Sequence, residues 1–231
     1  MRSIFILLGF LFSYSVFAKC DWCVYEQNSI KKEVENFLNL PPKKQLEKIE
    51  AEGIKVFILN PERKSGTPFF QWSTIRVDSG NLSDISKIEG SLGKTLCKGE
   101  RPIATNEYTI VLNSDAPLST LLHEYLHVKQ IKKDSNWCKI SKRLWGNNMP
   151  RVEDVKAVRD HEWDVRQTLW QARQHSAFNI EDHIVIAEGM IKEAQMRKDF
   201  DPQALEIVKK EKVEEYLLKE VDTFKQFLLK R

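Results

Sequence analysis

The chain has 231 residues, of which 36 are basic and 33 acidic, and its formal net charge is +3. This length suits one domain, or one domain with an appendage, and a charge so nearly balanced does not indicate a nucleic-acid partner. The sequence contains no internal repeat, no glycine-rich phosphate-binding loop and no low-complexity tract, so it does not indicate a repeat architecture or a nucleotide-binding protein.

The first 18 residues have the pattern of a secretory signal peptide. Arg2 precedes an uncharged, largely apolar run, and Val16-Phe17-Ala18 forms the recognition triplet for cleavage after residue 18. A retained membrane anchor is the alternative, but the apolar run is short for a membrane span. We therefore expect an exported protein, periplasmic or secreted, that has no stable membrane anchor and consists of residues 19–231.

All four cysteines remain after this cleavage, and an even count in an exported protein predicts two disulfide bonds with three connectivities open. A bridge between Cys97 and Cys138 would tie together two loops that flank the motif described below, and Cys20 would then pair with Cys23. A thioredoxin-like redox site is the alternative for Cys20 and Cys23, but no strand precedes them. A four-cysteine zinc site does not suit an oxidising compartment.

The N-terminal half is expected to form two helices and three strands. Apolar residues at helical spacing predict a helix over 29–40, and Pro41-Pro42 ends it and starts a second helix that runs to about residue 52. The segment 78–103 contains several glycines and is expected to be a long loop with one helical turn. Three segments rich in β-branched and aromatic residues predict the strands of one small sheet: 54–59, 69–77 and 108–112.

Residues 121–127, Leu-Leu-His-Glu-Tyr-Leu-His, contain the pattern His-Glu-x-x-His within a helical stretch. Histidines four residues apart lie on one face of a helix, so His123 and His127 can reach one metal ion while Glu124 points at whatever the metal holds. This pattern resembles the zincin superfamily of zinc metallopeptidases. The resemblance implies that His123 and His127 bind one zinc ion and that Glu124 is the general base for the attacking water.

The helix around this motif can begin at the turn Asp115-Ala116-Pro117, with Asp115 as its N-cap. Leucines and Tyr125 on one side would face the core, and the two histidines would lie on the other side. In zincins a strand in the place of 108–112 forms the edge of the cleft and pairs with an extended peptide. The resemblance implies the same role for this strand here.

A third zinc ligand has to come from elsewhere in the chain. The metzincin branch would have glycine and histidine three and six residues after His127, and these positions are Gln130 and Lys133, which excludes that branch. The gluzincin branch takes a glutamate from a later helix, and residues 152–170 predict such a helix. A carboxylate in a core-facing row is costly unless it is paired or binds a metal, so Glu162 is the predicted third ligand. It fills a gap in an apolar stripe of Val155, Val158, Val165 and Leu169.

Asp160 and His161 are the alternatives to Glu162 as the third ligand. Asp160 lies about 200 degrees around the helix in a polar row, and His161 lies about 100 degrees from the apolar stripe. Many gluzincins have an aspartate four residues after the ligand glutamate, where it orients a metal-bound histidine, and here that position is Arg166. The acceptor for the histidine would then be Asp160 or Asp164. Arg166 could stabilise an oxyanion or neutralise a carboxylate.

The C-terminal part is expected to be mainly helical. Trp137 and Trp145, between the two motif-bearing helices, could line a substrate pocket or belong to the core. Apolar residues at helical spacing predict two amphipathic helices over 180–196 and 202–229. These helices are expected to pack as a hairpin, about 178–231, that closes the cleft from below; the alternative is a partner-binding arm.

These patterns predict an α+β fold in a single domain over 19–231, with a zincin-like small sheet and active-site helix before the helical C-terminal part. The predicted function is that of an exported zinc-dependent metallopeptidase that holds one zinc ion and hydrolyses peptide bonds in a protein or peptide substrate. The alternative is a non-catalytic envelope binding protein on a zincin scaffold. A further possibility within the enzyme class is a hydrolase that acts on the peptide part of cell-wall polymers. The sequence gives no indication of the oligomeric state.

Overall fold

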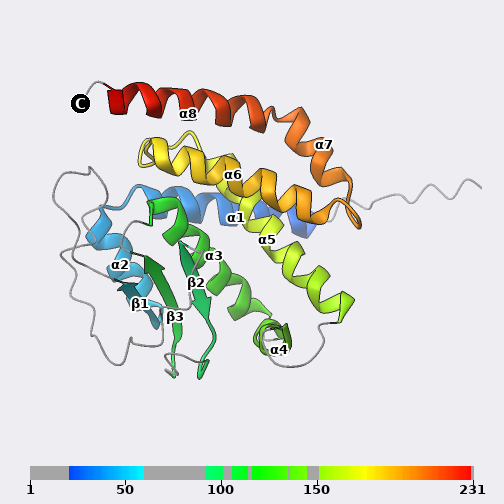
Figure 1. Ribbon diagram of the computed structural model, residues 1–231. Helices are drawn as coiled ribbons and strands as arrows, with labels where there is room; N and C mark the ends of the chain where they lie inside the picture. Colours follow the sequence, from blue (N-terminus) through cyan, green and yellow to red (C-terminus); the bar gives the residue numbers. More distant parts are fainter. Residues whose placement is uncertain are drawn as a thin grey trace, which may run out of the picture.

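The computed structural model describes residues 21–59, 92–100, 106–113, 116–134, 136–144 and 151–229 (Figure 1). The expected signal peptide, the expected strand at 69–77 and Trp145 lie outside these residues. Among the helices described, none is both long enough and apolar enough to cross a membrane. The elements in chain order are α1 (Asp21–Leu38), α2 (Pro42–Ala51), β1 (Ile54–Leu59), β2 (Gly93–Leu96), β3 (Tyr108–Asn113), α3 (Leu118–Lys133), α4 (Asn136–Leu144), α5 (Val152–Ala172), α6 (Ile180–Arg197), α7 (Gln203–Lys210) and α8 (Val213–Leu229).

The described strands form one mixed sheet in the order β1-β3-β2. β1 pairs with β3 in parallel, with Ile54 opposite Tyr108, and β2 pairs with β3 antiparallel, with Thr95 opposite Ile110. Figure 1 shows this sheet at one side of the molecule, and α6, α7 and α8 on the side away from it. A small sheet combined with many helices confirms the predicted α+β class.

The strand at 108–113 is the central strand of this sheet, which corrects its expected place at the edge of a cleft. Its residues Thr109 to Leu112 are all buried, as is typical of a strand covered on both faces. Because β3 is hydrogen-bonded to a neighbour on each side, it cannot also pair with an extended substrate. Among the described strands, β1 and β2 are the outer ones, and β2 lies in the segment expected to be a loop. A strand of four residues is too short to produce a readable alternation in the sequence.

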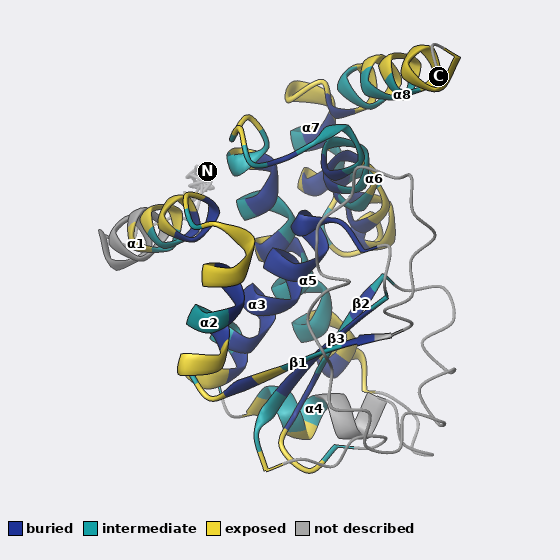
Figure 2. Ribbon diagram, turned by 90° about the vertical axis from the view of Figure 1, so that its left-hand side faces the viewer, coloured by how far each residue is buried: buried dark blue, intermediate teal, exposed yellow. Residues whose placement is uncertain are grey.

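Helix α3 lies at the centre of the molecule, between the sheet and the helices α5 and α6 (Figure 2). Every residue from Leu118 to Val128 is buried, so the side of the helix that carries the histidines is covered as well as the side that faces the core. Tyr125 fixes α3 to the N-terminal helices: its ring stacks on Phe37 at 5.1 Å, and its hydroxyl donates to Oε1 of Glu52 at 2.6 Å.

The first turn of α3 is capped by a residue from a different helix. Its N-cap residue is Pro117, which makes no side-chain cap hydrogen bond, and the expected cap, Asp115, lies outside the described residues. Instead, the backbone N–H of Ser119 donates to Oδ1 of Asp182 at 2.6 Å, while Oδ2 of Asp182 accepts from the backbone of Asn179 in the capping box of α6. Burial raises the pKa of this carboxyl, and backbone hydrogen bonds partly oppose that effect.

The C-terminal part differs from the expected pair of helices. α6 matches the prediction, but the segment 202–229 is divided into α7 and α8. The break lies at Lys212, whose φ of 53° is in the left-handed region, and no glycine or proline marks it in the sequence. The break lets Val213 become fully buried, while most of α8 beyond it is exposed or half-buried.

Candidate metal centre

Three side chains that could hold a metal ion converge between α3 and α5. His123 and His127 project from α3, and Glu162 projects from α5, with one ligand atom of each within 4.8 Å of the others. The two Nε2 atoms are 3.0 Å apart, Oε1 of Glu162 is 3.1 Å from Nε2 of His127, and Oε2 is 3.3 Å from Nε2 of His123. The structure thus brings together the three residues that the sequence singles out as ligands.

The prediction that the apolar stripe around Glu162 faces the core is only partly confirmed. Val165 and Leu169, on the C-terminal side of Glu162, are buried in the core. Val158 is half-buried and Val155 is 38% exposed, because the first turns of α5 extend beyond the sheet and the other helices. Glu162 therefore lies where the buried stripe begins.

The ring of His127 is held by Gln130, one turn along α3. The amide orientation of Gln130 follows from its hydrogen bonds, since Nε2 donates to the backbone oxygen of His161 at 3.0 Å. Its Oε1 therefore accepts from Nδ1 of His127 at 2.9 Å. In neutral His127 the proton is then on Nδ1, and the lone pair of Nε2 points toward Glu162 and His123.

Two ring nitrogens 3.0 Å apart repel each other unless a proton or a cation lies between them. Burial lowers the pKa of His123 to about 3, helped by the charges of Arg166 and His127, so this ring is neutral at ordinary pH. Burial also opposes the charged form of His127, but the carboxylates of Glu162 and Glu124 outweigh it and raise the pKa of His127. The site thus concentrates lone pairs and negative charge at one point, which suits a cation.

Glu162 stays ionised in this site. Burial favours its neutral acid, but the contacts with His123 and His127 outweigh that effect and hold the pKa of the carboxyl well below its usual range. Nδ1 of His123 is buried and has no hydrogen-bond partner among the described residues.

Glu124 is buried beside the two histidines. Only 6% of His123, 6% of Glu124 and 5% of His127 is exposed. The hydroxyl of Thr95 on β2 lies 2.8 Å from Oε2 of Glu124 and 2.9 Å from its backbone oxygen, so it can donate to one of them. Burial raises the pKa of Glu124, although His127 and Thr95 oppose the shift.

The close approach of β2 to α3 depends on Gly93. A Cβ at this position would lie 2.8 Å from Cγ2 of Thr120 and 3.0 Å from Cγ of Glu124. A larger residue would push β2 away from the helix, and with it Thr95. Thr95 and Gly93 are site residues that the sequence did not reveal, because they lie in the segment expected to be a loop.

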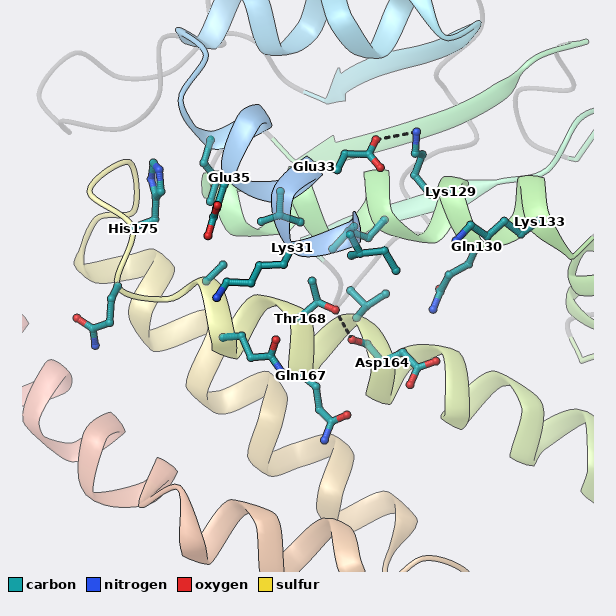
Figure 3. Close-up of a pocket in the computed structure, with 18 residues that line it drawn as sticks. Lys31, Glu33, Glu35, Lys129, Gln130, Lys133, Asp164, Gln167, Thr168 and His175 are labelled. Carbon is teal, nitrogen blue, oxygen red and sulfur yellow. Dashed lines mark hydrogen bonds and ion pairs between the residues drawn. The ribbon is translucent and has the colours of Figure 1, made fainter. Parts of the chain in front are cut away.

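The side chains considered as alternative ligands, or as acceptors for a metal-bound histidine, lie apart from the histidine pair. Asp160 is 45% exposed and pairs with Nη1 of Arg197 at 2.8 Å, on the side of α5 that faces α6. Asp164 is exposed and lines a groove of about 620 Å³ between α1, α3 and α5 (Figure 3). Neither supplies the acceptor for His127, which corrects that expectation. His161 reaches the site through its backbone oxygen, and its ring packs on Trp137.

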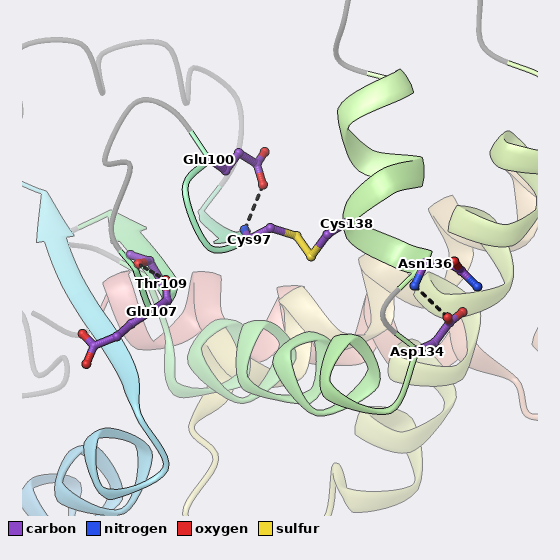
Figure 4. The surroundings of a disulfide bond; sticks show 7 residues. All are labelled: Cys97, Glu100, Glu107, Thr109, Asp134, Asn136 and Cys138. Atoms are coloured by element: carbon purple, nitrogen blue, oxygen red, sulfur yellow. Dashed lines mark hydrogen bonds between the residues drawn. A yellow bond between two sulfur atoms is a disulfide. The ribbon is translucent and has the colours of Figure 1, made fainter.

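A disulfide bond joins Cys97, just beyond β2, to Cys138 of α4 (Figure 4). This confirms the bridge expected between the segments that flank the motif. The bridge holds α4 so that the neighbouring Trp137 stacks between the rings of His127, at 6.1 Å, and His161, at 4.6 Å. Cys20 and the side chain of Cys23 lie outside the described part of the chain, so their pairing stays a prediction.

Arg166 lies one turn beyond Glu162, with Nε 3.9 Å from Oε2 of Glu162.

No family model, no curated protein and no solved structure matches this chain. The function is therefore inferred from the residues of the site.

Proposed function

We propose that this protein is an exported zinc-dependent metallopeptidase of the gluzincin type. The observation that carries the proposal is the convergence of two imidazole nitrogens and a carboxylate, 3.0 to 3.3 Å apart, beside the buried carboxylate of Glu124. Two histidines and one glutamate form a ligand set that catalytic zinc uses, with a fourth position left for substrate or water.

The spacing of the ligand atoms supports zinc. Atoms about 2.0 to 2.2 Å from a tetrahedral zinc ion lie roughly 3.3 to 3.5 Å from one another. The observed separations of 3.0 to 3.3 Å are close to these values, so small movements would complete the coordination. Gln130, which holds His127 through Nδ1, has the role that a hydrogen-bond acceptor usually has behind a zinc-bound histidine.

Zinc held there would polarise a peptide carbonyl and make a bound water acidic enough to attack it. Glu124 follows His123 in the sequence, is buried with both histidines and acts through its charge on His127, so it can take the proton of the attacking water and later pass it to the leaving amine. Thr95 restrains the Glu124 side chain by its hydrogen bond to Oε2, and a pKa raised by burial makes this carboxylate a stronger base than an exposed glutamate.

The disulfide supports export. Disulfide bonds persist in oxidising compartments and are rare in the cytosol, so the bridge between Cys97 and Cys138 suits a periplasmic or secreted protein. The sequence of the first 18 residues supports the same location.

The test is to measure zinc content and peptide hydrolysis on the same purified protein. We expect one zinc ion per chain by elemental analysis and cleavage of an unfolded protein that stops on addition of a chelator and returns with zinc. Zinc without cleavage of any peptide would favour the non-catalytic binding protein instead. Absence of bound zinc after incubation with the metal would refute the proposal.

A further inference from the structure

We propose that Arg166 is the anion-binding residue of this site, and that its guanidinium donates to the carbonyl oxygen of the substrate as that oxygen becomes negative. The proposal rests on the peptidase function proposed above. It assigns a role to a residue whose position holds an aspartate in many gluzincins, where the aspartate orients a histidine.

The distance from Arg166 to the metal position can be bounded from the ligand contacts. Nε of Arg166 is 3.9 Å from Oε2 of Glu162. Since a zinc ion would lie about 2.0 to 2.2 Å from that oxygen, it would be within about 6 Å of Nε. A carbonyl oxygen next to the ion is therefore within reach of the guanidinium.

The hydrogen-bonding state of Arg166 leaves it available for an anion. Its Nε is buried and has no hydrogen-bond partner among the described residues. The contact with Glu162 is too long for a hydrogen bond. The side chains of Arg166 and Glu162 are each 24% exposed, so both are partly accessible to solvent.

The charge of Arg166 is unfavourable for holding a metal ion. A guanidinium within several ångströms of a cation site opposes cation binding by electrostatic repulsion. The same charge favours an anion that forms during the reaction, when prearranged donors stabilise the transition state at no reorganisation cost.

The loaded site would have an excess of positive charge. Around the ligands, Glu193 on α6 pairs with Arg159 at 3.0 Å, and its charge also acts on Glu162 and Arg166. A divalent ion and the two guanidiniums of Arg159 and Arg166, set against the three carboxylates of Glu124, Glu162 and Glu193, leave one positive charge. When Glu124 takes the proton of the attacking water it loses its negative charge, and the oxyanion that forms replaces that charge close to the metal ion and Arg166.

Gly189 on α6 makes room for this side chain. A Cβ there would collide with Nη1 of Arg166 and would lie 2.8 Å from its Cζ and 3.0 Å from its Nε. Glycine is unfavourable inside a helix, and the close approach of the Arg166 guanidinium explains its presence at this position. Gly189→Ala would therefore displace Arg166 without changing any group that touches the metal position.

The oxygen of water bonds to the carbonyl carbon, and one proton of that water moves to Glu124. The π electron pair of the carbonyl moves to the carbonyl oxygen, which accepts a hydrogen bond from the guanidinium of Arg166. The C–N bond then breaks, the carbonyl re-forms, and the amine leaves with its electron pair and the proton from Glu124. The acid product releases its remaining proton to solvent.

The test compares Arg166→Gln, Arg166→Lys and Gly189→Ala with Glu188→Ala, a change at an exposed neighbour of Gly189 on the same helix. We expect Arg166→Gln to keep one zinc ion per chain and a KM close to that of the wild type, while kcat falls on the order of 100-fold or more. Arg166→Lys should recover part of kcat. Gly189→Ala should melt no lower than the wild type and still lose kcat, and Glu188→Ala should leave kcat unchanged.

A second measurement does not depend on activity. Inorganic phosphate is titrated into the cobalt-loaded protein, and binding is followed by the visible absorption of the cobalt. Phosphate should bind at least tenfold more weakly to Arg166→Gln and Gly189→Ala than to the wild type and Glu188→Ala. Equal phosphate affinity in all four proteins, or loss of metal from Arg166→Gln, would overturn the role of Arg166. If the wild type itself takes up no metal, the proposed function has failed, and that outcome is distinct from a failure of Arg166.

Discussion

Gln130 couples His127 to the helix that carries Glu162. Its Oε1 is 2.9 Å from Nδ1 of His127, and its Nε2 donates at 3.0 Å to the backbone oxygen of His161, the residue before Glu162. One amide therefore fixes the ring of a proposed ligand on α3 and the backbone beside a proposed ligand on α5. The relative position of the two ligands depends on this side chain.

Gln130→Ala should weaken zinc binding about 10- to 100-fold, because the ring of His127 loses its acceptor. Gln130→Glu should retain most of the affinity, since a carboxylate can still accept from Nδ1. Competition with a chromophoric chelator measures both, and Gln167→Ala, an amide of the groove in Figure 3, is the matched control. Zinc affinity unchanged in Gln130→Ala would show that the amide does not orient the ring.

Glu162→Ala should lose zinc under conditions in which the wild type retains it. Removing a direct ligand should cost more than the roughly 100-fold of a change behind a ligand. Asp160→Ala is the control, since Asp160 pairs with Arg197 and lies apart from the histidines. Elemental analysis after dialysis decides, and loss of zinc from Asp160→Ala with retention in Glu162→Ala would reassign the ligand.

Glu124→Gln should keep zinc and lose hydrolysis. The amide has the shape of the carboxylate and can still accept from Thr95, but it cannot take a proton from water. The loss of a general base lowers kcat on the order of 10² to 10⁴-fold. Activity and zinc content should be measured on the same sample, and a variant that cleaves as well as the wild type would remove Glu124 from the mechanism.

Replacing Cys97 and Cys138 together with serine should destabilise the protein. The bridge closes a loop with a sequence separation of 41, for which the loss of chain entropy in the unfolded state corresponds to about 4 kcal/mol. Urea unfolding of the double variant measures the change in the free energy of unfolding. Equal midpoints for the two proteins would mean that the bridge does not restrain the unfolded chain.

Glu52→Gln should lower stability at neutral pH more than at acidic pH. Burial raises the pKa of Glu52, but hydrogen bonds from Tyr125 and Lys129 outweigh it, and the net pKa is lowered. A carboxyl with a lowered pKa in the folded state stabilises the fold above its unfolded pKa, about 4.3, and loses that contribution as pH falls through the folded value. Thermal unfolding at pH 7 and pH 3 should therefore show a difference from the wild type that shrinks at pH 3; an equal difference at both would contradict the assignment.

The positions of the site residues on α3 and α5 follow from the sequence because their signals are local. The spacing of His123 and His127 places both rings on one helix face, and Glu162 is an acid within a row that becomes buried. Neither inference needs the arrangement of distant segments.

The residues that the sequence did not reveal depend on contacts between distant segments. Thr95 reaches Glu124 from a strand of only four residues. Asp182 caps α3 from 63 positions further along the chain. The break at Lys212 has no local signal and follows from the packing of Val213. In each case tertiary packing decides the conformation.

The buried carboxylate of Asp182 has a consequence for how the molecule folds. It lies at the N-terminal ends of both α3 and α6, where the dipoles of the two helices are positive, so a single negative charge stabilises both first turns. A chain truncated after α5 would leave the helix of the two histidines without this partner. Hydrogen exchange should therefore show α3 and α6 opening together, as one cooperative unit, despite their separation in the sequence.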